Sequence, residues 1–171
     1  MGGKRIIRIA AFGLFILIFV FVSHNNNHLY STWDNLEVDK CASAWLLVKF
    51  GDSKAVFRFY PEGGLINEGI PFDTPDSKFR RTYNKTSFEA VRDAFKVNDP
   101  IIKLMADIIR DIELNIWGRK KYRISDEINF KINQIIKNSA SAEEALKDSY
   151  KIFSSLYDEL KAGKFDIQEM N

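Results

Sequence analysis

The sequence has few of the residues that form covalent cross-links or metal centres. It contains one cysteine, Cys41, in 171 residues, which excludes an intramolecular disulfide and an all-cysteine metal site. Its two histidines, His24 and His28, lie in a polar stretch ahead of the first predicted core helix. A histidine-based catalytic or zinc site within the predicted core is therefore excluded, and we expect neither a metal nor another cofactor.

The chain also lacks a strong excess of charge of either sign. Its formal net charge is +2, whereas a dedicated nucleic-acid-binding protein usually has a stronger basic bias, so we expect no nucleic-acid partner. Hydrophobic residues make up 46% of the chain, an ordinary share for a globular protein that buries a core. The length suits one domain with a short appendage.

An uninterrupted apolar run of 14 residues extends from Ile9 to Val22, after Lys4, Arg5 and Arg8. This length lies between the apolar region of a secretory signal, about 7–15 residues, and a membrane-spanning helix of about 20. Small residues that would mark a cleavage site do not follow the run. We therefore predict an uncleaved signal anchor over residues 1–23, with a cleaved signal (and hence a secreted protein) or a buried helix as the alternatives.

Positive charge ahead of an anchor keeps the amino terminus in the cytoplasm and sends the rest of the chain across the membrane. We therefore expect a single-pass membrane protein whose domain is periplasmic or extracellular. Residues 24–33, with three consecutive asparagines, are predicted to form a polar linker. The domain is predicted to cover residues 34–165, and residues 166–171 to form a tail.

Residues 38–50 are predicted to form a helix that is buried on most of its circumference. Val38, Cys41, Ala42, Trp45 and Leu46 follow the spacing of one helical face. Cys41 lies on this face, so we expect it to be a buried structural thiol. The polar residues gather near the start of the helix, where Asp39 and Ser43 are four residues apart and share a face. A carboxylate there also suits the helix dipole, so a structural role competes with a catalytic one.

The rest of the domain combines short strands with long helices. Strands are predicted over residues 55–60 and 69–73, with a third over residues 78–83. Helix starts are marked by Thr86 with Glu89, by Asp99 with Pro100, by residues 125–127, and by Ser141 with Glu144; Gly163 marks the last helix end. The predicted fold class is α+β: a small early β-sheet packed with about five helices, preceded by the N-terminal membrane helix.

Four cations with no acid among them lie between residues 78 and 85: Lys78, Arg80, Arg81 and Lys85. Cations on a strand edge discourage pairing between sheets, which is one explanation of the cluster. The other is an anion-binding site.

Five motifs in order resemble the C-terminal domain of the chromate-resistance protein ChrB. They are Asp-Lys-Cys-Ala-Ser-Ala-Trp-Leu-Leu at 39–47, Ile-Pro-Phe-Asp at 70–73, Thr-Ser-Phe-Glu-Ala at 86–90, Asp-Pro at 99–100 and Ile-Ile-Arg at 108–110. The similarity runs over residues 37–113, and a weaker match at residues 152–157 resembles the last helix of that family.

The resemblance also shows where the chain departs from the family. Ser43 and Thr86 stand where the family has cysteine, and Lys78 and Arg81 align with its glutamate and histidine. Thiolate, imidazole and carboxylate are the usual metal or redox groups, so this replacement implies a retired site that has become cationic. The resemblance therefore favours a non-enzymatic domain over an enzyme.

The leading hypothesis is a membrane-anchored ChrB-like domain that binds a small oxyanion, a carboxylate or a protein partner. The residues expected to line its site are Asp39, Lys40, Ser43, Lys78, Arg81 and Thr86. One alternative is an enzyme that uses Asp39 and Asp73 as its acid–base pair. The other is a purely structural interaction module of the cell envelope. The DNA-binding role of ChrB is not carried over, because the membrane segment stands where the DNA-binding part would precede this domain.

Overall fold

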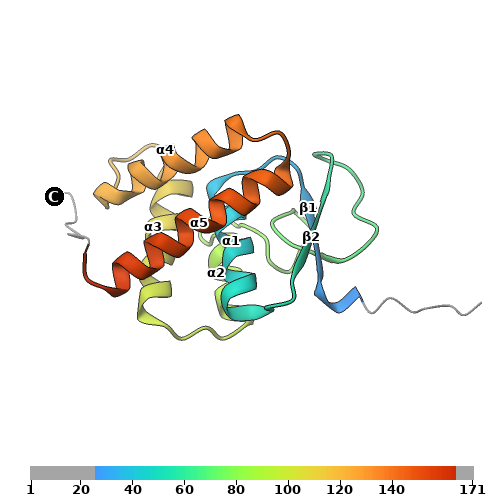
Figure 1. Ribbon diagram of the computed structural model, residues 1–171, viewed down its shortest axis with the longest axis horizontal. Coiled ribbons are helices and arrows are strands. Elements are labelled where there is room, and N and C mark those ends of the chain that lie inside the picture. The colour runs from blue at the N-terminus through green and yellow to red at the C-terminus, as the bar shows by residue number, and fades with distance from the viewer. Residues whose placement is uncertain (1–25, 165–171) are drawn as a thin grey trace, which may run out of the picture.

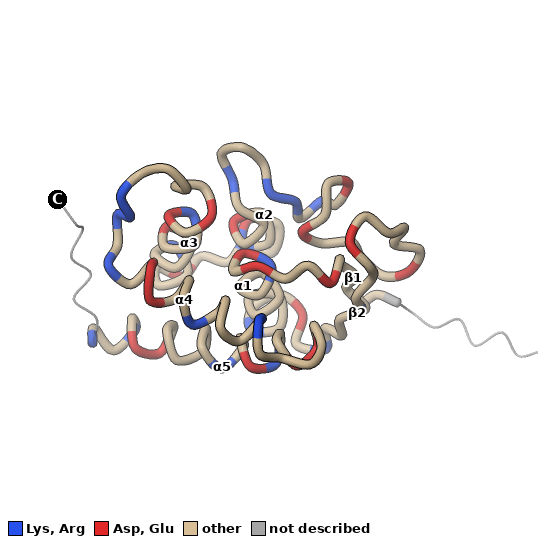
Figure 2. Tube along the Cα trace, turned by 90° about the horizontal axis from the view of Figure 1, so that it is seen from above, with Lys and Arg blue, Asp and Glu red and all other residues tan. Residues whose placement is uncertain are grey.

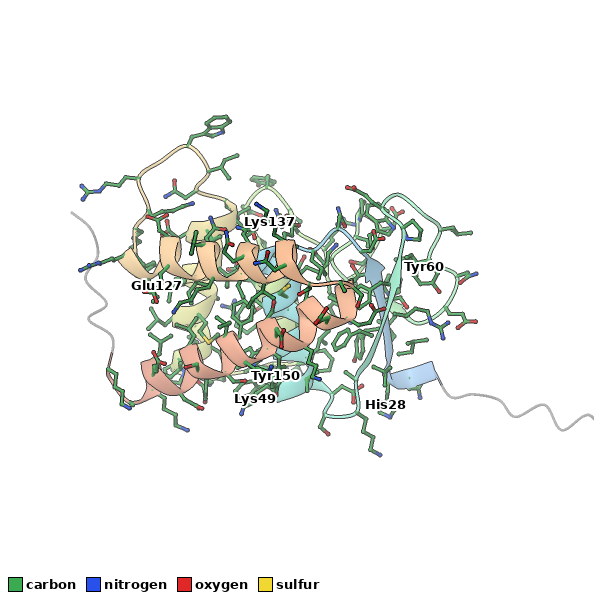
Figure 3. All side chains as sticks on the ribbon, turned by 45° about the horizontal axis from the view of Figure 1, so that its top comes forward. His28, Lys49, Tyr60, Glu127, Lys137 and Tyr150 are labelled. Carbon is green, nitrogen blue, oxygen red and sulfur yellow. The ribbon has the colours of Figure 1, made fainter. Side chains whose placement is uncertain are left out.

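The computed structural model describes residues 26–164, in which a small parallel sheet packs at one end of a group of five α-helices (Figure 1). Strand β1 (Leu29–Trp33) lies between β2 (Val56–Tyr60) and β3 (Ile70–Pro71). Both neighbours run parallel to β1, with Tyr30 opposite Phe57 on one side and Ile70 on the other. His28, just before β1, and Tyr60, at the end of β2, consequently lie at opposite ends of the strands (Figure 3).

The sheet corrects the predicted boundary between the linker and the domain. Residues 29–33 belong to the predicted linker, yet they form the central strand of the sheet, after a 3-10 turn at Asn26–His28. Tyr30, Ser31 and Thr32 are all buried, because β1 has a neighbouring strand on each side. A five-residue strand that contains Ser31 and Thr32 shows no alternation of apolar and polar residues, so its pattern does not separate it from the linker.

The predicted third strand, over residues 78–83, is also wrong. This segment forms isolated bridges, between Phe72 and Phe79 and between Thr82 and Lys85, and otherwise runs as a loop. The predicted strands at residues 55–60 and 69–73 are confirmed as β2 and β3, and the fold class is α+β. The predicted signal anchor and the tail at residues 166–171 lie outside the described residues. Within residues 26–164, no helix is long and apolar enough to cross a membrane.

Helix α1 (Val38–Leu46) is the centre of the core, as its apolar pattern predicted. It continues into a π-helical turn (Leu47–Gly51) and contacts each of the other four α-helices. Trp45 is buried and donates a hydrogen bond from its indole N–H to Ser154 Oγ at 3.0 Å. Cys41 is buried beside it on the same helix, as expected of a structural thiol.

The remaining helices are α2 (Ser87–Ala94), α3 (Pro100–Glu113), α4 (Arg123–Asn138) and α5 (Ala142–Lys161). Three predicted starts are confirmed by side-chain caps at Thr86, Asp99 and Ser141, and Gly163 follows α5 with φ of 64°. Helix α4 begins two residues earlier than predicted. The carboxylate of Asp111 accepts hydrogen bonds from the backbone N–H of Lys121 and Tyr122 and thereby fixes the chain just before α4.

Candidate functional site

The start of α1 lies against the start of α2, where acidic and basic residues are close together (Figure 2). The Asp39 side chain is 0% exposed, and its carboxylate accepts backbone hydrogen bonds from Ser87 at 2.7 Å and Phe88 at 2.8 Å. These are the first two residues of α2, whose N–H groups have no partner inside the helix. Asp39 therefore binds the positive end of the α2 dipole, which stabilises a negative charge there.

Arg81 connects this carboxylate to two others. Its Nε lies 3.4 Å from Asp39 Oδ2, its Nη1 lies 3.2 Å from Glu113 Oε2, and its Nη2 pairs with Glu37. Glu113 also accepts the backbone N–H of Asp39 at 3.0 Å. The guanidinium thus joins the start of α1, the end of α3 and the loop before α2, and each of its nitrogens faces a carboxylate.

Lys40 is a buried cation of the cluster, with 2% of its side chain exposed. Its Nζ donates to the backbone oxygens of Trp33 at 3.1 Å and Asn35 at 2.9 Å, and to Asn35 Oδ1 at 2.8 Å. An ammonium group has three donors, so these contacts use all of them. Lys40 fixes the chain between β1 and α1.

Asp73 follows β3 and has an unusual backbone conformation for a residue other than glycine, with φ of 48°. Its Oδ1 accepts a hydrogen bond from Ser87 Oγ, so Asp73 and Asp39 both bind Ser87. The side chain is 4% exposed, and Oδ2 has no hydrogen-bond partner among the described residues. Lys40 Nζ lies 3.8 Å from this oxygen, beyond hydrogen-bond distance.

A pocket of about 570 Å³ opens beside Lys40 and Asp73. It lies at the carboxyl ends of β1 and β3, where the chain leaves β1 toward α1 and leaves β3 toward the loop before α2. In open parallel sheets, ligands bind outside the carboxyl ends of strands whose connections diverge. The pocket is lined by Trp33, Asn35, Glu37, Lys40, Asp73, Thr74, Pro75, Arg80, Arg81 and Thr82.

Burial dominates the electrostatics of the cluster. It raises the pKa of Asp39 to about 7, with a further increase from the Asp73 carboxylate, against the lowering effect of the Phe88 and Ser87 N–H groups and of Arg81. Burial likewise raises the pKa of Asp73 and of Glu113, and lowers the pKa of Lys40. For Arg81, burial works against the charged form, but Glu113 and Glu37 outweigh it and raise the pKa.

Several of the site residues predicted from the sequence lie around Asp39. Ser43 Oγ lies 3.4 Å from Asp39 Oδ1, and Thr86 immediately precedes Ser87. Thr86 itself forms the predicted capping box with Glu89. Lys78 is different: it is exposed, its Nζ lies 5.8 Å from the ring centre of Phe79, and it does not line the pocket.

One member of the cluster, Glu113, was not predicted from the sequence. Glu113 is 74 residues from Asp39 and stands at the end of an otherwise apolar stripe, so no local pattern connects them. The contact of Asp39 with the start of α2 did have a signal in the sequence. The capping box at Thr86 marks the start of a helix, and the free N–H groups of Ser87 and Phe88 require an acceptor.

Within residues 26–164, no group of three or more histidine, cysteine, aspartate or glutamate side chains is placed to hold a metal ion. The resemblance seen in the sequence implies that Ser43, Lys78, Arg81 and Thr86 stand where the family has metal- or redox-competent groups. Three of these, Ser43, Arg81 and Thr86, lie around Asp39.

Comparison with known proteins matches one family. The sequence model of the ChrB C-terminal domain covers residues 30–160, from the central strand β1 to the end of α5. Neither the curated proteins nor the solved structures give a match. Because the matched segment takes in every element of the sheet and every helix described above, the chain belongs to the ChrB C-terminal domain family.

Proposed function

We propose that this protein is a non-catalytic, ligand-binding member of the ChrB C-terminal domain family, and that its ligand is a small molecule bound in the pocket beside Lys40 and Asp73. The observation that carries the proposal is Asp73 Oδ2, a buried carboxylate oxygen at the pocket that accepts no hydrogen bond from the described residues. A buried polar atom without a partner is costly, and a ligand atom would supply the missing bond. The backbone of Asp73 has positive φ, a conformation that is often found at ligand sites.

The arrangement of the carboxylates argues against an enzyme that uses Asp39 and Asp73 as an acid–base pair. Asp39 is 0% exposed, does not line the pocket, and binds the N–H groups of Ser87 and Phe88 with its two oxygens. A general base must reach the proton that it removes. Asp39 therefore serves as a positioning residue that holds α2 against α1.

The proposal that the pocket binds a small molecule has more support than the narrower prediction that the ligand is an anion. Lys40 uses its three donors on Trp33 and Asn35, and Arg81 faces three carboxylates. Arg80 lines the pocket from its exposed side and donates to the Pro75 carbonyl at 3.2 Å. An anion would therefore meet Arg80 at the rim rather than Lys40 or Arg81, whose donors already face protein oxygens.

We also propose that residues 1–23 anchor the domain to a membrane and that the domain is exported. The support is the apolar run from Ile9 to Val22 after three cations. Alkaline extraction of membranes from cells expressing the full chain tests the anchor, and protease treatment of intact cells or spheroplasts tests the export. Release of the protein by alkali, or a domain protected from external protease, would contradict this proposal.

Ligand binding is tested by screening the full-length protein against a small-molecule library that spans cations, anions, zwitterions and apolar compounds. Thermal unfolding reports binding because a ligand that binds the folded state raises Tm. We expect hits whose effect disappears in Thr82→Trp, which places an indole at the pocket wall. The matched control is Gln134→Trp on the exposed face of α4, which should retain every hit. A library without a hit, or hits that survive Thr82→Trp, would overturn the proposal and favour a purely structural module.

A further inference from the structure

Two neighbouring loops carry the most exposed aromatic side chains of residues 26–164. Trp117, between α3 and α4, is 94% exposed, and Tyr83, in the loop before α2, is 93% exposed. Ile116, next to Trp117, is 64% exposed. The loops lie side by side, because both line one pocket and because Arg110, near the end of α3, donates a hydrogen bond to the Asn84 carbonyl at 2.7 Å. The exposed apolar side chains therefore belong to one surface instead of standing singly.

The loop between α3 and α4 is braced by its own polar residues. The Asn115 side chain accepts the backbone N–H of Gly118 at 3.1 Å and donates to the Arg119 carbonyl at 2.8 Å. A Cβ at Gly118 would lie 2.3 Å from Asn115 Oδ1, so this bracing requires glycine. Lys120 Nζ donates to three carbonyl oxygens at and just after the end of α3. The loop is thus held in a shape that keeps Trp117 at its tip and in solvent.

The same loop is basic. From residue 114 to residue 131 five cations stand against two acids, and residues 114–123 contain no acid. One of the two acids, Glu127, pairs with Lys131. Figure 2 shows the basic residues of this loop and of the loop before α2 along the same edge of the molecule. The exposed cations next to the tip are Arg119, Lys121 and Arg123. Positive charge therefore surrounds the exposed apolar side chains.

We propose that this surface docks on an anionic phospholipid bilayer, with Trp117 and Ile116 entering the headgroup region and Tyr83 beside them. Tryptophan and tyrosine favour membrane interfaces, because one part of each ring system is apolar and another is polar. Each lysine or arginine close to an anionic membrane strengthens binding about fivefold. Apolar side chains at loop tips suit a fluid interface, whereas a protein partner needs a surface of complementary shape. The proposed anchor would hold the domain near such a bilayer, but docking does not depend on it.

The test is fluorescence quenching of the full-length protein by vesicles whose lipids are brominated in the upper part of the acyl chains. The chain has three tryptophans, and none lies in residues 1–25, so insertion of that segment gives no signal of its own. Trp45 is buried and Trp33 is only partly exposed. We expect quenching on phosphatidylcholine vesicles that contain about one-third phosphatidylglycerol, and much less on phosphatidylcholine alone. Trp117→Ala should remove the quenching, which assigns the signal to the loop tip.

A second variant keeps Trp117 as the reporter and removes charge. Arg119→Gln combined with Arg123→Gln should lower the ratio of docked to undocked protein, read from the quenching, at least about fivefold. The matched control is Lys49→Gln combined with Lys137→Gln, the same charge change at exposed positions outside both loops, which should leave the ratio unchanged.

The inference is overturned if the protein sediments with the vesicles while Trp117 is not quenched, or if quenching is equal on both kinds of vesicle. It is also overturned if the control variant weakens docking as much as the arginine variant does. A dimer that is lost in Trp117→Ala, without quenching in the wild type, would assign the surface to a second copy of the chain instead. Each of these results leaves the proposed pocket beside Lys40 and Asp73 standing. A protein that does not sediment with anionic vesicles would overturn both the docking surface and the proposed anchor.

Discussion

The carboxylate of Asp39 accepts a hydrogen bond from the backbone N–H of Phe88 at 2.8 Å, although the two residues are 49 positions apart in the chain. One residue is in the first turn of α1 and the other in the first turn of α2. The contact therefore makes a side chain of one helix serve as the end cap of another. This arrangement explains why a fully buried carboxylate is tolerated in the core: the helix end, Arg81 and Ser43 all face it.

Replacing Asp39 with alanine should destabilise the domain strongly. The change leaves the N–H groups of Ser87 and Phe88 without an acceptor and removes one of the carboxylates from Arg81. Removing one member of a buried ion pair costs about 3–5 kcal/mol, so we expect a loss of about 3 kcal/mol or more. Urea unfolding of the full-length protein measures it.

The control for this variant is Asp148→Ala on α5, an aspartate whose partner, Lys151, is exposed. It should leave the unfolding midpoint unchanged, because exposed ion pairs contribute little. If the Asp39 variant unfolded at the same urea concentration as the Asp148 variant, Asp39 would have no part in holding α2.

The helices were predictable because their signals are local. Asp99 with Pro100, and Thr86 with Glu89, mark helix starts within a few residues. Strand β1 was missed because its pairing partners, β2 and β3, come later in the chain, and five residues that include Ser31 and Thr32 carry little pattern of their own. Its burial is a property of the assembled sheet.

The site, like the fold, was predictable only where its residues lie close together in the sequence. Asp39 and Ser43 share a face by helical spacing, and the sequence placed both correctly in one group. Lys78 was grouped with Arg81 by proximity in the chain, but the loop turns the two side chains to different environments: Arg81 faces Glu113 and Lys78 is exposed. Two further carboxylates of the site, Glu113 and Asp73, come from the end of α3 and from the residue after β3. No sequence spacing relates these positions to Arg81.

Stability should fall as the pH rises from about 5 to about 8. The pKa of Asp39 is about 7 in the folded protein, above its usual value of roughly 4, because burial favours the protonated form. Between these values the folded state binds a proton that the unfolded state lacks, so raising the pH costs stability. We expect a loss of roughly 2 kcal/mol over this range, measured by urea unfolding at each pH.

Two features of the pH dependence of stability test whether Asp39 causes the decline. Below about pH 4, stability should fall again, because Asp99 and Asp111 have lowered pKa values despite some burial, through hydrogen bonds that favour their charged forms. In Asp39→Asn, the decline between pH 5 and 8 should flatten, whatever the overall stability of that variant. A wild-type protein that became more stable from pH 5 to pH 8 would contradict the assignment.

Cys41 should be unreactive in the folded protein. It is buried on α1, and burial raises the pKa of its thiol to about 12, so the thiolate that reacts with disulfide reagents is scarce at neutral pH. A disulfide reagent such as dithionitrobenzoate should modify the native protein at least about a hundredfold more slowly than the protein in denaturant. Fast labelling of the native state would mean that α1 opens readily, which its central position in the core argues against.

Asp111 should matter for the start of α4 in the way that Asp39 matters for α2. Its carboxylate accepts hydrogen bonds from the N–H groups of Lys121 and Tyr122 and from Ser125 Oγ at 2.6 Å. Alanine at this position leaves these donors unpaired, so we expect a loss of about 2 kcal/mol in unfolding free energy. The amides of residues 121 and 122 should also exchange with solvent faster than in the wild type, since local opening now competes with a weakened cap.

The matched control is Asp107→Ala, one turn earlier on the exposed side of α3, which should change neither the unfolding free energy nor the exchange rates. Equal exchange rates in both variants would show that the start of α4 is held by packing of Tyr122 and Ile124 instead, both of which are buried.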